Sequence, residues 1–315
     1  MKTALVVSVR NEAATIRQTL EAMDAQTRPP DEIVLVDGGS TDGTLEALEE
    51  WARDLPARMV LSSPGASIGG ARNLAIGKSQ GEIVAVTDAG CLPERDWLEK
   101  ITAPLLAHSA DFAKGFYRGD PRSRFERLTD CLNLPDSHEV DPGGFMPSSR
   151  SVAFTRAIWE RVGGYPEWLE VGEDMYFDFR IVEAGARSVF VPDAVVWWRL
   201  RPDLRGFFRQ YFNYARGDGL AGMYPRRHAV RFGAYASGAG VAAAAGRWPA
   251  ALALPVTLGA AWLLPSYRRA FRRLPLVEAL MAVPALPLLA AVMDLAKMAG
   301  YLAGLRKRRR LPPAS

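Results

Sequence analysis

Four acidic residues stand where an enzyme built on a sheet would place reactive groups. Asp37 and Asp88 each follow a short apolar run, and Glu173 and Asp174 form a pair before a helical stretch. A carboxylate in such a place can accept a hydrogen bond from a nucleobase, hold a divalent cation or remove a proton from a hydroxyl. The same acids are also good turn and helix-start residues, so each position taken alone leaves that structural alternative open.

The elements that must position these acids alternate along the first hundred residues. Strand patterns cover residues 4–9, 32–36, 58–62 and 82–87, and helix patterns cover 12–23, 44–52 and 69–78. This alternation predicts an α/β fold with a Rossmann-like, mostly parallel sheet flanked by helices. Ligands of such sheets bind beyond the carboxyl ends of the strands. The polar clusters at residues 10–12, 37–40 and 88–90 lie at those ends, which predicts a nucleotide site.

Composition excludes several classes of protein. A net charge of +4 over 315 residues is too mild for a dedicated nucleic-acid binder. Two cysteines cannot make a disulfide framework, and this fits a reducing compartment. The three histidines are far apart in the sequence, so we expect no histidine-based zinc site.

From about residue 229 onward the chain becomes rich in Ala, Gly, Leu and Val. Apolar stretches cover residues 234–245, 248–264 and 276–292, and basic runs cover 268–273 and 306–310. An anionic leaflet attracts such basic runs, and a spanning helix needs about 20 apolar residues. We therefore expect a catalytic domain over 1–225 and a hydrophobic, membrane-associated helical segment with a basic tail over 226–315.

Two alternatives for the C-terminal segment stay open. In the first, the basic runs form a solvated tail. In the second, the apolar stretches form an ordinary buried helical subdomain. Because both basic runs prefer the cytoplasmic side, residues 274–305 either do not span the membrane or form a hairpin. Residues 294–305 have the pattern of an amphipathic helix lying in the membrane plane.

The ordered motifs of the first 220 residues resemble those of the family 2 glycosyltransferases. The matching segments are Val-Ser-Val-Arg-Asn-Glu at 7–12, Val-Asp-Gly-Gly-Ser-Thr-Asp-Gly-Thr at 36–44, Gly-Ala-Arg-Asn at 70–73, Val-Thr-Asp-Ala-Gly at 86–90, and Gly-Gly-Tyr at 163–165 leading to Gly-Glu-Asp at 172–174. The resemblance implies a GT-A-type fold followed by C-terminal hydrophobic helices. It also implies inverting transfer from a nucleotide-diphosphate sugar.

The resemblance assigns the donor site to the ends of the first strands. Asp37 would contact the base, and Arg72 would hold the diphosphate where a helix begins after a glycine-rich stretch. A surface arginine is the alternative for Arg72. The other expected donor contacts are Val9, Asn11, Glu12, Gly39 and Asn73.

Asp88 is the expected metal ligand, for Mg²⁺ or Mn²⁺. Many relatives carry Asp-x-Asp here, but the third position of this chain is Gly90. Either Asp88 holds the cation with help from waters and phosphate oxygens, or the metal matters less than usual.

The resemblance makes Asp174 the catalytic base, with Glu173 beside it. A histidine that often helps to hold the diphosphate is replaced by Arg199 or Arg201, which would carry a permanent charge. The aromatic and basic stretch 207–217, with Gln210, would cap the active site. Its alternative is an amphipathic helix on the bilayer.

The expected function is transfer of single sugars to a membrane-presented, lipid-linked acceptor. The Gln-x-x-Arg-Trp signature of processive synthases is absent after Gln210. We expect the inner membrane as location, with the catalytic domain on the cytoplasmic side. The alternatives are a nucleotidyltransferase and a catalytically inactive membrane scaffold.

Overall fold

The central sheet follows the strand pattern of the sequence and continues beyond it. The computed structural model describes residues 1–244, 246, 250 and 253–310. Eight strands form one sheet in the order β3-β2-β1-β4-β7-β6-β8-β5. Their bounds are β1 Thr3–Val9, β2 Glu32–Asp37, β3 Arg58–Ser62, β4 Ile83–Val86, β5 Cys91–Pro93, β6 Phe112–Gly119, β7 Val152–Thr155 and β8 Ser188–Trp198.

The sheet is mixed, with a parallel half where the sequence predicted one. β1 pairs in parallel with β2 and β4, β2 with β3, and β6 with β8. The pairs β4–β7, β6–β7 and β5–β8 are antiparallel. The expected Rossmann-like, mostly parallel sheet is therefore confirmed.

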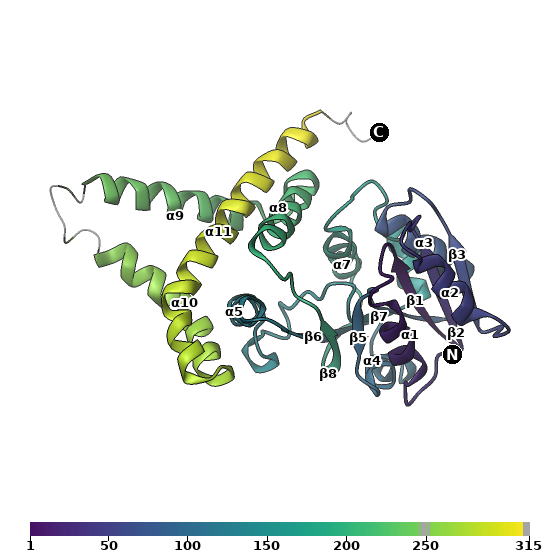
Figure 1. The fold of residues 1–315 in the computed structure, drawn as a ribbon. Coiled ribbons are helices and arrows are strands. Elements are labelled where there is room, and N and C mark those ends of the chain that lie inside the picture. Colours follow the sequence, from purple (N-terminus) through teal and green to yellow (C-terminus); the bar gives the residue numbers. More distant parts are fainter. Residues whose placement is uncertain (245, 247–249, 251–252, 311–315) are drawn as a thin grey trace. The chain divides into compact units, whose positions relative to one another are not determined.

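Six helices of this sheet domain cover its two faces (Figure 1). α1 (Ile16–Asp24), α2 (Thr44–Ala52) and α4 (Trp97–Leu106) pack on one face, and α3 (Ile68–Lys78), α6 (Arg156–Val162) and α7 (Glu173–Glu183) on the other. β1 serves both faces, since Leu5 and Val7 join the first apolar cluster and Val6 joins the second. This alternation follows from the two-residue period of a strand.

The described chain divides into two compact units. The first comprises Met1–Asp120 and Asp136–Arg199, and the second Pro121–Pro135 and Leu200–Ser315. The second unit contains α5 (Arg124–Asn133), α8 (Leu204–Ala221), α9 (Pro225–Ala244), α10 (Ala253–Arg273) and α11 (Leu276–Arg308). The expected end of the catalytic domain at residue 225 stays a prediction.

α5 is inserted in the middle of the sequence but packs with the C-terminal helices of its own unit. Arg127 donates to both carboxylate oxygens of Glu278 at 2.8 Å. Arg273 pairs with Asp130 at 2.8 Å, and Nε of Arg269 donates to the carbonyl of Cys131 at 2.8 Å. Two arginines of the basic run 268–273 thus hold α5, where the sequence had indicated attraction to lipid.

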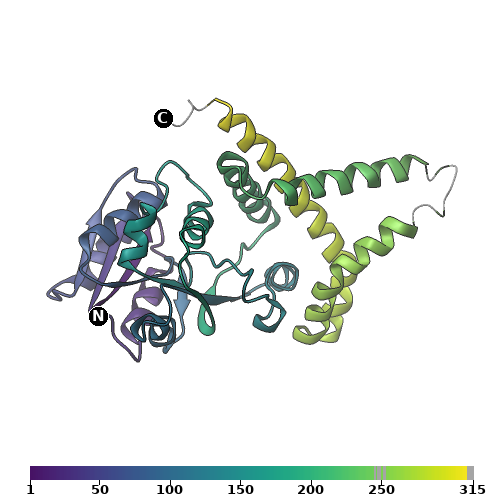
Figure 2. The ribbon, with the colours of Figure 1, turned by 180° about the vertical axis from the view of Figure 1, so that it is seen from behind.

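α8 and α11 approach each other closely because glycines face the contact, and they lie side by side in both views (Figure 1 and Figure 2). A Cβ at Gly300 would run into the carbonyl of Phe212, and one at Gly304 into that of Arg216. Glycine is required wherever two backbones approach this closely.

α11 is continuous over 33 residues, and Pro284 and Pro287 lie inside it. The hairpin expected as one alternative for residues 274–305 is therefore wrong. Among the described residues, α11 is the one helix long and apolar enough to cross a membrane, and an 18-residue window of it has a mean hydropathy of 2.1. The expected apolar stretch 248–264 lies in α10 from Ala253 onward, and Trp248 falls outside the described residues.

The glycine contact gives a sharp stability prediction. Replacing glycine by alanine inside a helix normally stabilises a protein by about 0.5–1 kcal/mol. Gly259→Ala in α10 should follow this rule, because a Cβ there meets nothing within 4 Å. Gly300→Ala should instead destabilise by about 1–3 kcal/mol, since overpacking forces the helices apart. Circular dichroism of both variants during unfolding in detergent measures whether each substitution raises or lowers the stability. Equal shifts would contradict the packing of α8 on α11.

Candidate active site

Arg72 joins two carboxylates that lie far apart in the sequence. Arg72 lies in the first turns of α3. Its Nη1 donates to Glu173 Oε1 at 2.7 Å, and its Nη2 donates to Asp88 Oδ1 at 2.6 Å. The Arg72 residue is only 2% exposed. Three of the predicted site residues therefore form one buried ion-pair network at the rim of the sheet.

The two acids at the start of α7 have different surroundings. Glu173 is buried against Arg72, while Asp174 is partly open. Burial, and next the charge of Asp174, raise the pKa of Glu173 to about 7, against the opposing effect of Arg72. Asp174 Oδ1 accepts a hydrogen bond from the backbone N of Met175 at 2.8 Å. Of the pair, Asp174 is the one placed to meet a second molecule.

Arg150 is a second cation near Asp88 that the sequence did not reveal. Its Nε lies 4.0 Å from Asp88 Oδ2, and its guanidinium lies 4.3 Å from the ring centroid of Trp198. Arg150 belongs to the polar stretch Ser-Ser-Arg-Ser at 148–151, directly before β7. This stretch precedes its strand, whereas the polar clusters that the sequence pattern indicated follow their strands.

Gly90 leaves room that a carboxylate from another loop occupies. The Gly90 backbone has φ +78°, and a Cβ added there would lie 3.2 Å from Glu12 Oε2. The same oxygen accepts a hydrogen bond from Thr15 Oγ1 at 2.7 Å. Glu12 thus faces the turn that begins at Asp88, where Cys91 N donates to the Asp88 carbonyl at 3.1 Å.

The expected base-binding residues connect the loops after β1 and β2. Asp37 is 1% exposed, and its Oδ2 accepts from the backbone N of Gly39 at 2.9 Å and of Ser40 at 3.0 Å. Val9 accepts from Gly38 N at 2.9 Å, and Asn11 Oδ1 accepts from Thr41 N at 2.9 Å. The turn role considered for Asp37 is therefore present, and its contact with a base stays a prediction.

Asn73, Arg199 and Gln210 are not part of the ion-pair network. The Asn73 amide binds the backbone of Tyr165 and the Glu167 carboxylate, so it orders the loop between α6 and α7. Arg199 is exposed directly after β8. Gln210 belongs to α8 of the second unit, where Nε2 donates to the Tyr214 hydroxyl at 3.0 Å. Donor contacts by these three residues stay predictions.

One turn after Asp174, α7 carries a fully buried acid that the sequence did not single out. Among the residues that the structure describes, neither carboxylate oxygen of Asp178 has a hydrogen-bond partner. Burial, and next the charge of Asp174, raise the pKa of Asp178 well above its ordinary range, although Lys114 and Arg72 oppose this. The Lys114 ammonium donates instead to the carbonyls of Pro142 and Phe145. The folded protein therefore favours the protonated form of Asp178.

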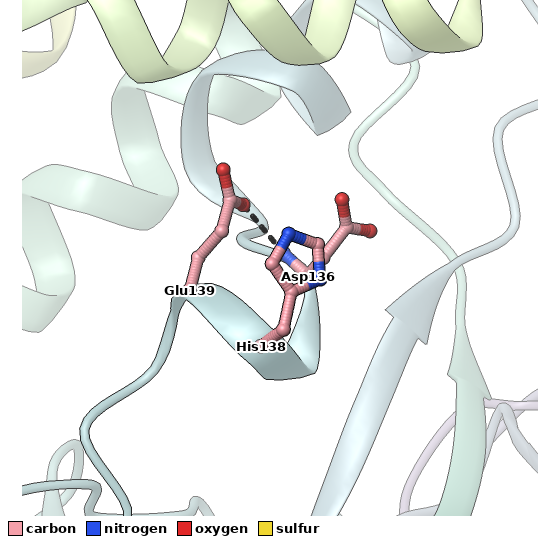
Figure 3. Close-up of side chains that lie close together, drawn as sticks. All are labelled: Asp136, His138 and Glu139. Carbon is pink, nitrogen blue, oxygen red and sulfur yellow. Dashed lines mark hydrogen bonds between the residues drawn. The ribbon is translucent and has the colours of Figure 1, made fainter.

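A separate group of three potential metal ligands lies in the short 3-10 helix η1 (Ser137–Glu139) and the residue before it. Figure 3 shows the His138 ring between the carboxylates of Asp136 and Glu139. Glu139 and His138 are exposed, and Glu139 Oε2 accepts from the backbone N of Asp136 at 2.7 Å. Capping of this turn accounts for the close approach of the two acids.

Asp178 gives a pH-dependent stability prediction. Since the folded state binds the Asp178 proton more tightly than the unfolded state, stability falls as pH rises above the pKa of an unfolded aspartate, about 3.9. Asp178→Asn removes this loss, so its advantage over the wild type should grow between about pH 4 and pH 8. Urea unfolding at several pH values measures it. Asp193→Asn, at an exposed site in β8, is the matched control. A pH-independent difference would refute the buried protonated acid.

Comparison with known proteins gives the same family as the motifs. Residues 4–141 match the model of glycosyl transferase family 2. Glycosyltransferase AglE from Haloferax volcanii is 28% identical over 211 residues, which cover 63% of this chain and 67% of AglE. Succinoglycan biosynthesis protein ExoA from Rhizobium meliloti is 28% identical over 224 residues, which cover 68% of each chain.

A solved structure supports the fold over nearly the whole chain. The mannosyltransferase PcManGT from Pyrobaculum calidifontis, in complex with GDP-Man and Mn²⁺, has a TM-score of 0.60 and 25% identity. The match covers 98% of this chain and 87% of that one. The chain is therefore a glycosyltransferase with a GT-A-type fold, and its residues 4–141 match glycosyl transferase family 2.

Proposed function

We propose that this enzyme transfers one sugar at a time, with inversion, from a nucleotide-diphosphate sugar to an acceptor at a membrane. The observation that carries the proposal is the network in which Arg72 joins Asp88 to Glu173, with the open acid Asp174 next in the chain. The mannosyltransferase with the similar fold binds GDP-Man and Mn²⁺, which supports a nucleotide-sugar donor and a divalent metal.

On the donor side, Asp88 fits a divalent cation. Its side chain is 29% exposed, and the space beside it at Gly90 faces a second carboxylate. The cation, Mg²⁺ or Mn²⁺, would offset the negative charge of the leaving diphosphate. Arg72 and Arg150 add positive charge at Asp88. The left-handed turn at Gly39 and the loop residues Val9, Asn11 and Asp37 would hold the nucleoside.

On the acceptor side, Asp174 acts as the base. Its carboxylate takes the proton of the acceptor hydroxyl while the hydroxyl oxygen attacks the anomeric carbon. The new oxygen–carbon bond forms on the face opposite the diphosphate, whose bond to that carbon breaks. One displacement therefore inverts the anomeric configuration. Glu173 is a positioning residue, because its carboxylate is committed to Arg72.

The second unit supports a membrane-presented acceptor. Large apolar side chains on α11 are exposed at a seven-residue spacing, at Met281, Leu288, Leu295 and Leu302. Because seven residues are close to two helical turns, they form one apolar stripe along the helix. An exposed stripe of this kind suits lipid. The stripe supports an acceptor presented at a membrane, and we propose a lipid-linked one at the cytoplasmic side of the inner membrane.

Product analysis combined with one variant tests the reaction. The wild type should convert a nucleotide sugar and acceptor into nucleoside diphosphate and a product of inverted configuration, seen by NMR. Asp174→Asn should lower turnover by about 10²–10⁴-fold, because the amide cannot take the proton. The variant should still bind the donor, as measured by thermal shift.

Asp193→Asn is the control for this variant, since Asp193 is exposed on β8. Release of pyrophosphate would indicate nucleotidyl transfer instead. Full turnover by Asp174→Asn would remove Asp174 as the base. No turnover of any nucleotide sugar by the wild type would favour the inactive scaffold.

A substitution in the apolar stripe tests membrane attachment. Leu288→Arg should lower the fraction of protein retained on inner membranes after washing, because it replaces an apolar side chain of the stripe by a charged one, and burial of a leucine side chain contributes about 1.5–3 kcal/mol. Leu55→Arg in the first unit makes the same chemical change at an exposed leucine and should leave retention unchanged. A wild-type chain that stays in the soluble fraction would contradict the proposal.

A further inference from the structure

Gly90 and Glu12 occupy complementary space at the metal side of the site. All three terminal atoms of Glu12 lie within 4 Å of a Cβ added at Gly90, with Oε2 at 3.2 Å, Cδ at 3.6 Å and Oε1 at 3.7 Å. A Cβ at position 90 would therefore crowd this carboxylate. The Glu12 carboxylate thus lies where the last acid of Asp-x-Asp would begin.

The backbone of Glu12 is held firmly while its carboxylate is left largely available. Glu12 N donates to Thr44 Oγ1 at 2.8 Å, and its carbonyl accepts from Thr15 N and Ile16 N. Within the described ranges, Thr15 Oγ1 is the one donor to the carboxylate, and no lysine, arginine or histidine pairs with it. Glu12 is also only partly buried. A held carboxylate without a counter-ion fits a cation ligand.

Asp88 begins the same turn. The turn runs from Asp88 to Cys91, whose N donates to the Asp88 carbonyl, and Gly90 is inside it. Asp88 supplies one carboxylate from the end of β4, and Glu12 supplies another from the loop after β1. Two carboxylates with the diphosphate oxygens and waters are the ligand set that Mg²⁺ or Mn²⁺ prefers.

We propose that Glu12 holds the divalent cation together with Asp88, and so replaces the carboxylate missing at Gly90. This assignment rests on the proposed donor chemistry. It moves Glu12 from a contact with the nucleoside to a metal ligand. The cation would then still have two carboxylate ligands.

The test measures Mn²⁺ binding directly, from the loss of the free-ion EPR signal, with the full chain in the presence of UDP or GDP. Glu12→Gln keeps the size and the hydrogen-bond acceptor for Thr15 but removes the charge. It should raise the Mn²⁺ Kd at least about tenfold. Glu50→Gln is the matched control, because Glu50 lies on the surface of α2 beside Arg17. Its Mn²⁺ Kd should equal that of the wild type.

A second variant moves the acid back to position 90. Glu12→Ala should bind Mn²⁺ at least as weakly as Glu12→Gln, and Glu12→Ala/Gly90→Asp should recover most of the lost affinity. Aspartate is among the residues that tolerate a positive φ, so the double variant can fold. Its thermal unfolding midpoint checks this. A folded double variant as weak as Glu12→Ala would overturn the proposal.

The outcomes separate this inference from the proposed function. An unchanged Mn²⁺ Kd in Glu12→Gln, with a raised Kd in Asp88→Asn, would overturn the role of Glu12 and leave sugar transfer intact. Full wild-type transfer in EDTA would overturn the metal site alone. Pyrophosphate as the product would instead overturn the proposed function, whatever the Mn²⁺ result.

Discussion

The charge network around Arg72 is the constraint on which the rest of the site depends. A guanidinium that is almost fully buried is tolerated only if carboxylates compensate it, and removal of one partner of such a group typically costs about 3–5 kcal/mol. Asp88 and Glu173 provide this compensation from the end of β4 and the start of α7. The need to neutralise Arg72 therefore joins the proposed donor side of the site to the proposed acceptor side.

Three acids of α7 differ in burial, and they therefore differ in what their side chains can do. Asp178 has no hydrogen-bond partner in the described part of the chain and favours its protonated form. Glu173 pairs with Arg72, and Asp174 is open to a second molecule. The three have similar chemistry in isolation. Their surroundings alone decide which one can act as a base, as in other enzymes where paired carboxyls have separate roles.

The second unit shows how one helix can serve packing and exposure at once. Gly300 and Gly304 of α11 face α8, while Leu288 and Leu295 are exposed. Small residues allow close contact between backbones, so the helices associate without large apolar side chains. Those side chains remain available for lipid. Arginines of the basic run 268–273 hold α5 in this unit, although the composition of that run had predicted contact with the membrane surface.

The sequence alone determined the parallel half of the sheet and the rim on which the site lies, because strand and helix periods are local and the carboxyl ends of parallel strands share an edge. It also indicated Asp88 and the acidic pair at 173 and 174. Only the tertiary structure decided that Arg72 meets an acid 101 residues away, that Glu12 faces Gly90, and that Asp178 is buried. Such pairings depend on how distant loops meet in space, and local periodicity carries no record of that.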